Sequence, residues 1–129
     1  MPRLYDYIDE QGRNLFKDWT RGLQKHELTK LNQKLDMLER NGADLSTGLL
    51  SDTPSPCIKK IRINGPVACR PLLCRGPIDM QHEFTLLVGA FEKDRRLPKV
   101  DIAAAEECRN EIIRNQFRRR KHERVEWNA

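Results

Sequence analysis

A set of leucines with a 3-4-3 spacing forms the clearest hydrophobic pattern in this chain. Its members are Leu28, Leu31, Leu35 and Leu38. Charged residues surround them, so the pattern predicts an amphipathic helix, and Asn41-Gly42 is a typical C-terminal stop. Before it, an apolar residue at every fourth position predicts a shorter helix. Those residues are Leu15, Trp19 and Leu23. Together the two segments predict an antiparallel helical hairpin.

Strand-like patterns flank this hairpin. Residues 4–9 contain Leu4 and Ile8 among other β-formers and predict a short first strand. After the hairpin, residues 43–56 are rich in Gly, Pro, Ser and Thr and are expected to form a loop. Residues 57–94 then hold three runs of strand-forming residues separated by glycine-bearing turns, which predicts an antiparallel β-meander.

Glycines and prolines refine the predicted layout of the meander. Asn64-Gly65 separates the first two runs and is a strong hairpin signal. Gly76-Pro77 opens a longer connection to the third run. Pro71 lies inside the second run, and it indicates an edge strand or a bulge because proline donates no hydrogen bond to a ladder.

A last helix is expected after Pro98, with Asp101 capping or charging its start. Its predicted buried stripe consists of Ile102, Ala105, Ile112 or Ile113, and Phe117. Cations dominate from about residue 118, where the chain either extends the helix or frays. The sequence thus predicts one α+β domain over residues 1–129, with a strand, a helical hairpin, a meander, a C-terminal helix and a basic tail.

Composition narrows the functional classes. One third of the 129 residues are charged, the formal net charge is +5 and the isoelectric point is near 9.2. This balance suits RNA, DNA or an acidic protein partner, and it also suits an ordinary basic protein. No apolar run approaches the roughly 20 residues that cross a bilayer. The first residues lack the apolar core of a signal peptide. We therefore expect a cytoplasmic protein with no membrane partner.

The cysteines show no Cys-x-x-Cys pair and no zinc-ligand spacing. They are Cys57, Cys69, Cys74 and Cys108. Three of them lie in predicted strands, where cysteine behaves as a small hydrophobic residue. We expect buried, reduced thiols, and neither a metal nor a cofactor.

Cations recur throughout the meander and are candidates for binding something negative. They are Lys59, Lys60, Arg62, Arg70 and Arg75. For a small cytosolic protein, a nucleic-acid backbone is a natural partner for such charge. Strand alternation places Lys60 and Arg62 on one face and Ile61 and Ile63 on the other. The alternative is that both cations simply occupy the solvent side of an amphipathic strand.

Three short motifs follow one another along the meander. They are Lys59-Lys60-Ile61-Arg62, Cys69-Arg70-Pro71-Leu72, and the run Leu86-Leu87-Val88-Gly89-Ala90-Phe91-Glu92-Lys93. Pro98 and an acidic, alanine-containing helix come next. This order of elements and motifs, from about Leu4 to Ile113, resembles the RelE/ParE superfamily of bacterial toxins, especially its HigB-like, phage-derived branch.

The resemblance implies a compact α+β toxin fold and a type II toxin–antitoxin pair. The cognate antitoxin is expected to be a helix-turn-helix protein, which could share part of the leucine stripe of the long helix. Some relatives cleave mRNA on the ribosome, whereas the ParE branch inhibits DNA gyrase, so fold alone does not fix the activity. The first hypothesis is a ribosome-dependent mRNA endonuclease, and the alternative is a nonenzymatic ParE-like inhibitor or a phage-derived binding protein.

Cleavage through the RNA 2′-hydroxyl needs a base, an acid and cations that stabilise the phosphate, and the resemblance points to no metal. The candidate catalytic residues are Lys60, Arg62, Arg70 and Lys93. The candidate RNA-binding residues are Arg75, Phe91, Arg118, Arg119 and Arg120.

The chain also departs from the family pattern. Val88 stands where the motif has His, Ala90 where it has Phe, and Glu92 where it has the first of two lysines. His82 precedes the third strand and is the one histidine near the meander, whereas His26 and His122 fall in helix-surface and tail contexts. The missing imidazole and phenol at the end of the third run count against efficient cleavage.

Overall fold

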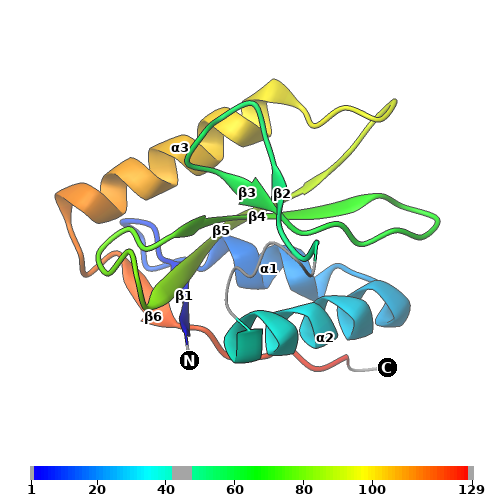
Figure 1. Cartoon of the computed structure of the whole chain (residues 1–129), viewed down its shortest axis with the longest axis horizontal. Coiled ribbons are helices and arrows are strands. Elements are labelled where there is room, and N and C mark those ends of the chain that lie inside the picture. Colours follow the sequence, from blue (N-terminus) through cyan, green and yellow to red (C-terminus); the bar gives the residue numbers. More distant parts are fainter. Residues whose placement is uncertain (1, 42–47, 128–129) are drawn as a thin grey trace.

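The computed structural model describes residues 2–41 and 48–127, which contain three helices and six strands (Figure 1). The helices are α1 (Leu15–Arg21), α2 (Lys25–Asn41) and α3 (Lys99–Arg114). The strands are β1 (Arg3–Tyr7), β2 (Ser51–Asp52), β3 (Lys59–Lys60), β4 (Cys69–Arg75), β5 (Glu83–Phe91) and β6 (Arg119–Lys121). The predicted α+β class is therefore confirmed.

All six strands belong to one mixed sheet with the order β2-β3-β4-β5-β1-β6. The strands from β2 to β5 form the antiparallel meander. β1 joins its far side parallel to β5, and β6 pairs antiparallel with β1. The expectation that the basic tail extends the last helix or frays is wrong, because residues 119–121 complete the edge of the sheet.

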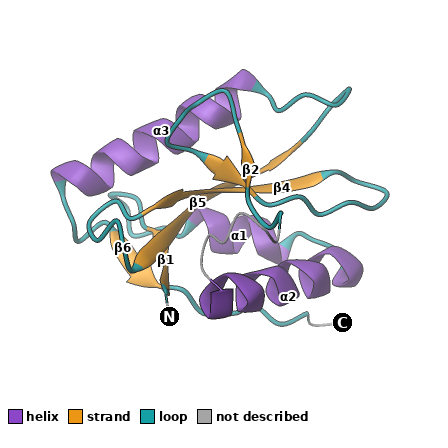
Figure 2. Ribbon diagram, in the orientation of Figure 1, coloured by secondary structure: helices purple, strands orange, loops and turns teal. Residues whose placement is uncertain are grey.

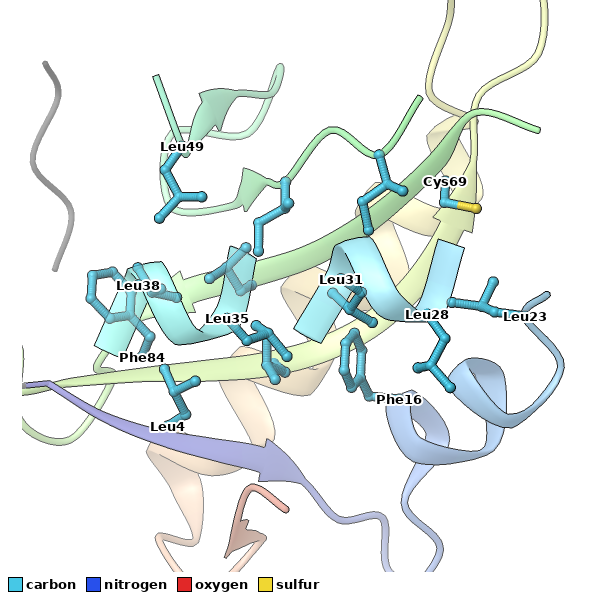
Figure 3. Packing of buried hydrophobic residues seen from close by; sticks show 14 residues of the cluster. Leu4, Phe16, Leu23, Leu28, Leu31, Leu35, Leu38, Leu49, Cys69 and Phe84 are labelled. Carbon is cyan, nitrogen blue, oxygen red and sulfur yellow. The ribbon is translucent and has the colours of Figure 1, made fainter. Parts of the chain in front are cut away.

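The sheet lies between two helical layers, with α1 and α2 on one face and α3 on the other (Figure 2). The leucine stripe of α2 is buried against the sheet together with Phe16 of α1 (Figure 3). Leu15 is 36% exposed, so its predicted place in this core is taken by Phe16, which is fully buried. Leu23 is buried and Trp19 packs against this core, as predicted, and the Asn14 side chain caps the start of α1 by accepting from the Lys17 amide.

The second core lies under α3. Ile102, Ala105, Cys108 and Ile112 are buried there, as the spacing predicts for three of them. Phe117 is 82% exposed, so its predicted burial is wrong. The helix ends at Arg114, and Asn115 is extended, which turns Phe117 away from the helical face.

Of the two alternatives for Pro71, the edge strand is wrong, because Pro71 lies in an interior strand, whereas the bulge agrees with the irregular register beside it. β4 runs between β3 and β5, and its register with β5 is irregular just beyond Pro71, between Leu72 and Leu73. The Pro71 carbonyl accepts from the Ile61 amide, but proline has no N–H to return. The β3 ladder is therefore interrupted, and pairing resumes only at the bridge between Ile63 and Cys69.

The remaining sequence-based expectations have mixed outcomes. The hairpin at Asn64-Gly65 is confirmed, with residues 64–68 as its loop. The short β2 interrupts the predicted loop 43–56, and the helix stop expected at Gly42 lies outside the described residues. Cys57 is exposed, whereas the other three cysteines are buried free thiols. Among the helices that the structure describes, none is long and apolar enough to cross a membrane.

Candidate nucleic-acid interface

A groove of about 640 Å³ lies on the α3 side of the meander. Its walls are the loop before β3, the turn after β5 and the first turns of α3. The lining residues are Pro54, Ser55, Pro56, Lys60, Arg95, Arg96, Leu97, Lys99, Ile102 and Glu106. We call this the α3 groove. It combines apolar walls with a concentration of positive charge.

Four cationic side chains and one carboxylate line the α3 groove. The cations are Lys60, Arg95, Arg96 and Lys99, and the carboxylate is Glu106. Within the described residues, Arg95, Arg96 and Lys99 form no ion pair, and all three are exposed. A recess lined by one sign of charge concentrates ligands of the opposite sign, so the α3 groove favours an anion.

The turn after β5 projects two of these cations. Asp94 and Arg95 both have positive φ, at 52° and 63°, which matches the two-residue turn preferred in hairpins. Lys93 and Arg96 close it by exchanging backbone hydrogen bonds of 2.9 Å in both directions. The tight turn therefore fixes the backbone that carries Arg95 and Arg96 above the groove.

Beside the groove, Lys60 and Arg70 converge on Glu92. The Lys60 Nζ lies 3.1 Å from Glu92 Oε1, and the Arg70 Nε donates to the same oxygen. The three side chains are 13%, 8% and 9% exposed, respectively. Burial alone would raise the pKa of Glu92, but the hydrogen bonds and charges of Arg70 and Lys60 hold it below its ordinary value.

Arg70 uses its guanidinium to hold the β-hairpin around it. Its Nη1 donates to the carbonyls of Cys69 and Ile63, at 2.8 and 3.4 Å, and its Nη2 lies 3.2 Å from Asn64 Oδ1. Its predicted contact with phosphate stays a prediction, and the geometry gives this side chain a positioning role. Lys60 retains more access, because it lines the α3 groove itself.

The other candidate catalytic residues are exposed. Arg62 follows β3 and forms no ion pair with any residue in the described ranges. Lys93 lies at the base of the turn that carries Arg95. Its charge also reaches Asp101, where burial raises the carboxyl pKa and Lys93 opposes that increase.

The structure does not bring the predicted RNA-binding residues together. Arg75 ends β4 and lies over the ring of Phe84, 5.5 Å from its centroid. Phe91 packs against Trp19 of α1, on the sheet face opposite α3. The basic residues 118–120 lie at the β6 edge of the sheet, whereas Lys60 lies near the β2 edge.

Arg119 is also engaged within the protein. It pairs with Glu83, whose side chain is only 2% exposed, and its guanidinium lies 4.2 Å from the centroid of the Tyr5 ring. Glu92 is likewise engaged within the protein, because it is nearly buried between its two cations. Strand patterning alone reveals neither pairing.

Sequence reasoning missed Arg95, Arg96 and Lys99. A usable signal was present, since four cations occur within residues 93–99 immediately before a predicted helix. His122 was also misjudged as a tail residue. It is buried, with its Nδ1 2.8 Å from Asp6 Oδ1, and it fastens the C-terminal segment to β1. His82 is exposed beside Asp79 and lies outside the α3 groove.

No protein-family model matches this chain, and no curated protein matches it either.

Proposed function

We propose that this chain is a toxin of the RelE/ParE type that binds single-stranded mRNA in the α3 groove and cleaves it on the ribosome. The toxin assignment rests on the order of sequence motifs. The observation that carries the RNA assignment is the set of four cations around a groove with apolar walls. Lysine and arginine bind phosphate oxygens, and single-stranded RNA exposes bases that pack on apolar surfaces.

The surfaces of the α3 groove suit both parts of a nucleotide. Arg95, Arg96 and Lys99 supply positive charge that is not engaged by a carboxylate in the described part of the chain. Leu97 and Ile102 supply apolar wall. A volume of about 640 Å³ falls within the range of about 300–1,000 Å³ typical of small-molecule sites. The groove therefore has room for a nucleotide and its flanking phosphate.

In the proposed reaction, the 2′ oxygen attacks the adjacent phosphorus and the bond to the 5′ oxygen breaks. The products are a 2′,3′-cyclic phosphate and a 5′-hydroxyl. Glu92 accepts the 2′ proton, and Lys60 stabilises the extra negative charge on the phosphate and donates a proton to the leaving oxygen. A phosphate that attracts Lys60 also removes one of the two cations that lower the pKa of Glu92, which makes this carboxylate a stronger base.

The test combines growth with cleavage. Expression of the chain should arrest growth, and in a translation extract it should cut mRNA only when ribosomes are engaged. Lys60→Ala should lower the cleavage rate by about 10²–10³-fold, as expected when one stabilising group is lost. Arg114→Ala removes an exposed cation far along α3 and serves as the matched control. Normal growth at confirmed expression of folded protein would refute the toxin assignment.

A nonenzymatic inhibitor is the second candidate, and one observation favours it. Neither histidine nor tyrosine lines the α3 groove, and Glu92 is already paired with two cations. This candidate predicts growth arrest without any cut in mRNA. Primer extension on mRNA from arrested cells distinguishes the two, because only the endonuclease creates new 5′ ends.

An antitoxin with an acidic segment fits either candidate. The leucine stripe of α2 is fully occupied by its own core, with the four leucines at most 3% exposed, so it offers no shared apolar surface. The unpaired cations of the α3 groove are the more suitable contact. Co-expression with a neighbouring helix-turn-helix gene should yield a complex that dissociates as salt rises.

A further inference from the structure

A second cavity, of about 370 Å³, lies on the other side of the loop that borders the α3 groove. Its lining residues are Leu50, Asp52, Pro56, Cys57, Lys59, Arg75, Met80, Phe84 and Arg109. We call it the Arg109 cavity. Like the α3 groove, it joins apolar side chains to an excess of cations.

The charges of the Arg109 cavity are incompletely matched. Lys59 pairs with Asp52, which leaves Arg75 and Arg109 with no carboxylate partner among the described residues. The Arg109 Nε is buried and donates to no acceptor in that part of the chain. Buried donors in proteins normally have acceptors, so this guanidinium has capacity for an anionic ligand.

The cavity also has surfaces that suit an aromatic base. Arg75 lies over the Phe84 ring, with its Cζ 5.5 Å from the ring centroid, so the ring supports one side of the guanidinium. Bases in single-stranded RNA stack on arginine planes and on aromatic rings. Met80, which is 48% exposed, adds apolar surface to the cavity lining. An acidic peptide would match the charge but would leave this apolar surface unused.

The α3 groove and the Arg109 cavity adjoin one another. Pro56 lines both, and the face of α3 that carries Ile102 and Glu106 in the groove carries Arg109 in the cavity. Ile102 and Arg109 are seven residues apart, which is about 10 Å along a helix. A short stretch of extended single-stranded RNA can span that distance.

We propose that the Arg109 cavity binds a second nucleotide of the RNA strand that occupies the α3 groove, with its phosphate at Arg109 and its base beside Arg75. This inference rests on the proposed function and extends it. On this proposal the substrate is a single-stranded RNA, of which one nucleotide binds in the α3 groove and another binds in the Arg109 cavity. The loop that contains Pro56 separates the two sites.

Cys57 offers a direct test, because it lines the Arg109 cavity and is the exposed cysteine of the four. Burial raises the pKa of the Cys74 and Cys108 thiols to about 12 and also raises the pKa of Cys69, so these three alkylate slowly. The rate of iodoacetamide labelling at Cys57, read by mass spectrometry, therefore reports occupancy. A fluorescent single-stranded oligoribonucleotide measures total binding in the same samples.

The single-stranded RNA should slow Cys57 labelling at least about tenfold at saturation, whereas a duplex of the same sequence should not, since its bases are paired. Arg109→Met should abolish most of this protection and weaken binding about tenfold, the effect of losing a charge-assisted contact. Arg114→Met, on the same helix, removes an equal charge and should preserve both. Arg75→Met, at the exposed end of β4, should lower protection independently of Arg109.

The outcomes separate this inference from the proposed function. RNA that binds without protecting Cys57, or a duplex that protects equally, overturns the second nucleotide position and leaves the α3 groove assignment intact. Absence of RNA binding overturns both. Polyglutamate that protects Cys57 as well as RNA does would identify an acidic protein segment as the occupant and refute the nucleotide.

Discussion

The indole of Trp19 lies directly on the backbone of Gly89. A Cβ added at residue 89 would come within 1.8 Å of Trp19 Cδ2. The same indole contacts the rings of Phe16 and Phe91, with centroid separations of 5.8 and 5.5 Å. Because Gly89 has no side chain, the Trp19 indole contacts the backbone of β5 directly, and α1 packs closely against that strand. A glycine inside a strand is a recognised sign of such a close approach.

Gly89→Ala should therefore destabilise the fold. The new methyl group forces Trp19 away from the sheet, and overpacking of this kind costs about 1–3 kcal/mol. Urea unfolding followed by tryptophan fluorescence measures the change. Gly65→Ala is the control, because its Cβ would meet no atom closer than 3.4 Å. Equal unfolding midpoints for the two variants would contradict the proposed close contact between Trp19 and Gly89.

Glu92→Gln should lower the free energy of unfolding at neutral pH by about 3 kcal/mol, since Arg70 would be left buried without its counter-charge. The exposed pair of Glu107 and Arg114 provides a control, and Glu107→Gln should be nearly neutral. Urea titrations at pH 7 measure both. A neutral Glu92→Gln would show that the carbonyls of Cys69 and Ile63, together with Asn64 Oδ1, are enough to hold Arg70.

The same carboxylate predicts an acid dependence. The pKa of Glu92 is lower in the folded chain than its ordinary value of 4.5, so its stabilisation is complete above that value. This stabilisation is lost as the pH falls from 4.5 through the folded pKa. The stability difference between wild type and Glu92→Gln should therefore shrink on acidification. A difference that stays constant from pH 7 to pH 3 would contradict the ion-pair interpretation.

Removing two cations from the α3 groove should weaken RNA binding and its salt dependence together. We choose Arg96→Ala with Lys99→Ala, which leaves the two turn residues of positive φ, Asp94 and Arg95, unchanged. If both side chains contact phosphates, the logarithmic salt slope should fall by about 1.4, or 0.7 for each contact with a single strand. Fluorescence anisotropy across a salt series measures the slope, with Arg114→Ala as the control.

Arg119 and Arg120 should respond differently to alanine. Arg119→Ala leaves the buried Glu83 without its partner and should cost about 3 kcal/mol of stability. Arg120 is exposed, so Arg120→Ala should leave stability unchanged. Thermal melting separates them. A stable Arg119→Ala variant that binds RNA less tightly would instead support the RNA-binding role expected from the sequence.

The periodicity of apolar residues correctly predicted which side chains are buried where the burial depends on a single helix or strand. The leucine stripe of α2 is buried as its spacing requires, and Ile61 and Ile63 are buried on the core side of their segment. In the first helical segment only Leu15 departs from its predicted burial, because Leu23 is buried and Trp19 packs against the same core, whereas Phe16 takes the place of Leu15. Short helices offer few turns over which such an error can be detected.

Features that depend on distant partners were not predictable in this way. Residues 119–121 carry three cations and no hydrophobic alternation, yet the ladder with β1 and the pairing of Arg119 with Glu83 make them a strand. The α3 groove joins residues 54–60 to residues 95–106. Its charge was visible in the sequence, but its shape arises only when the meander and α3 pack together.

The position of β1 has a consequence for synthesis of the chain. Arg3 pairs with Glu83, and Tyr5 pairs with Lys121, so β1 must wait for partners that are made much later. Such non-local pairing slows folding, because chain entropy is lost before the contacts form. A nascent chain that lacks α3 also lacks one wall of the α3 groove. The ribosome that makes this protein therefore synthesises at least residues 54–106 before the α3 groove can assemble.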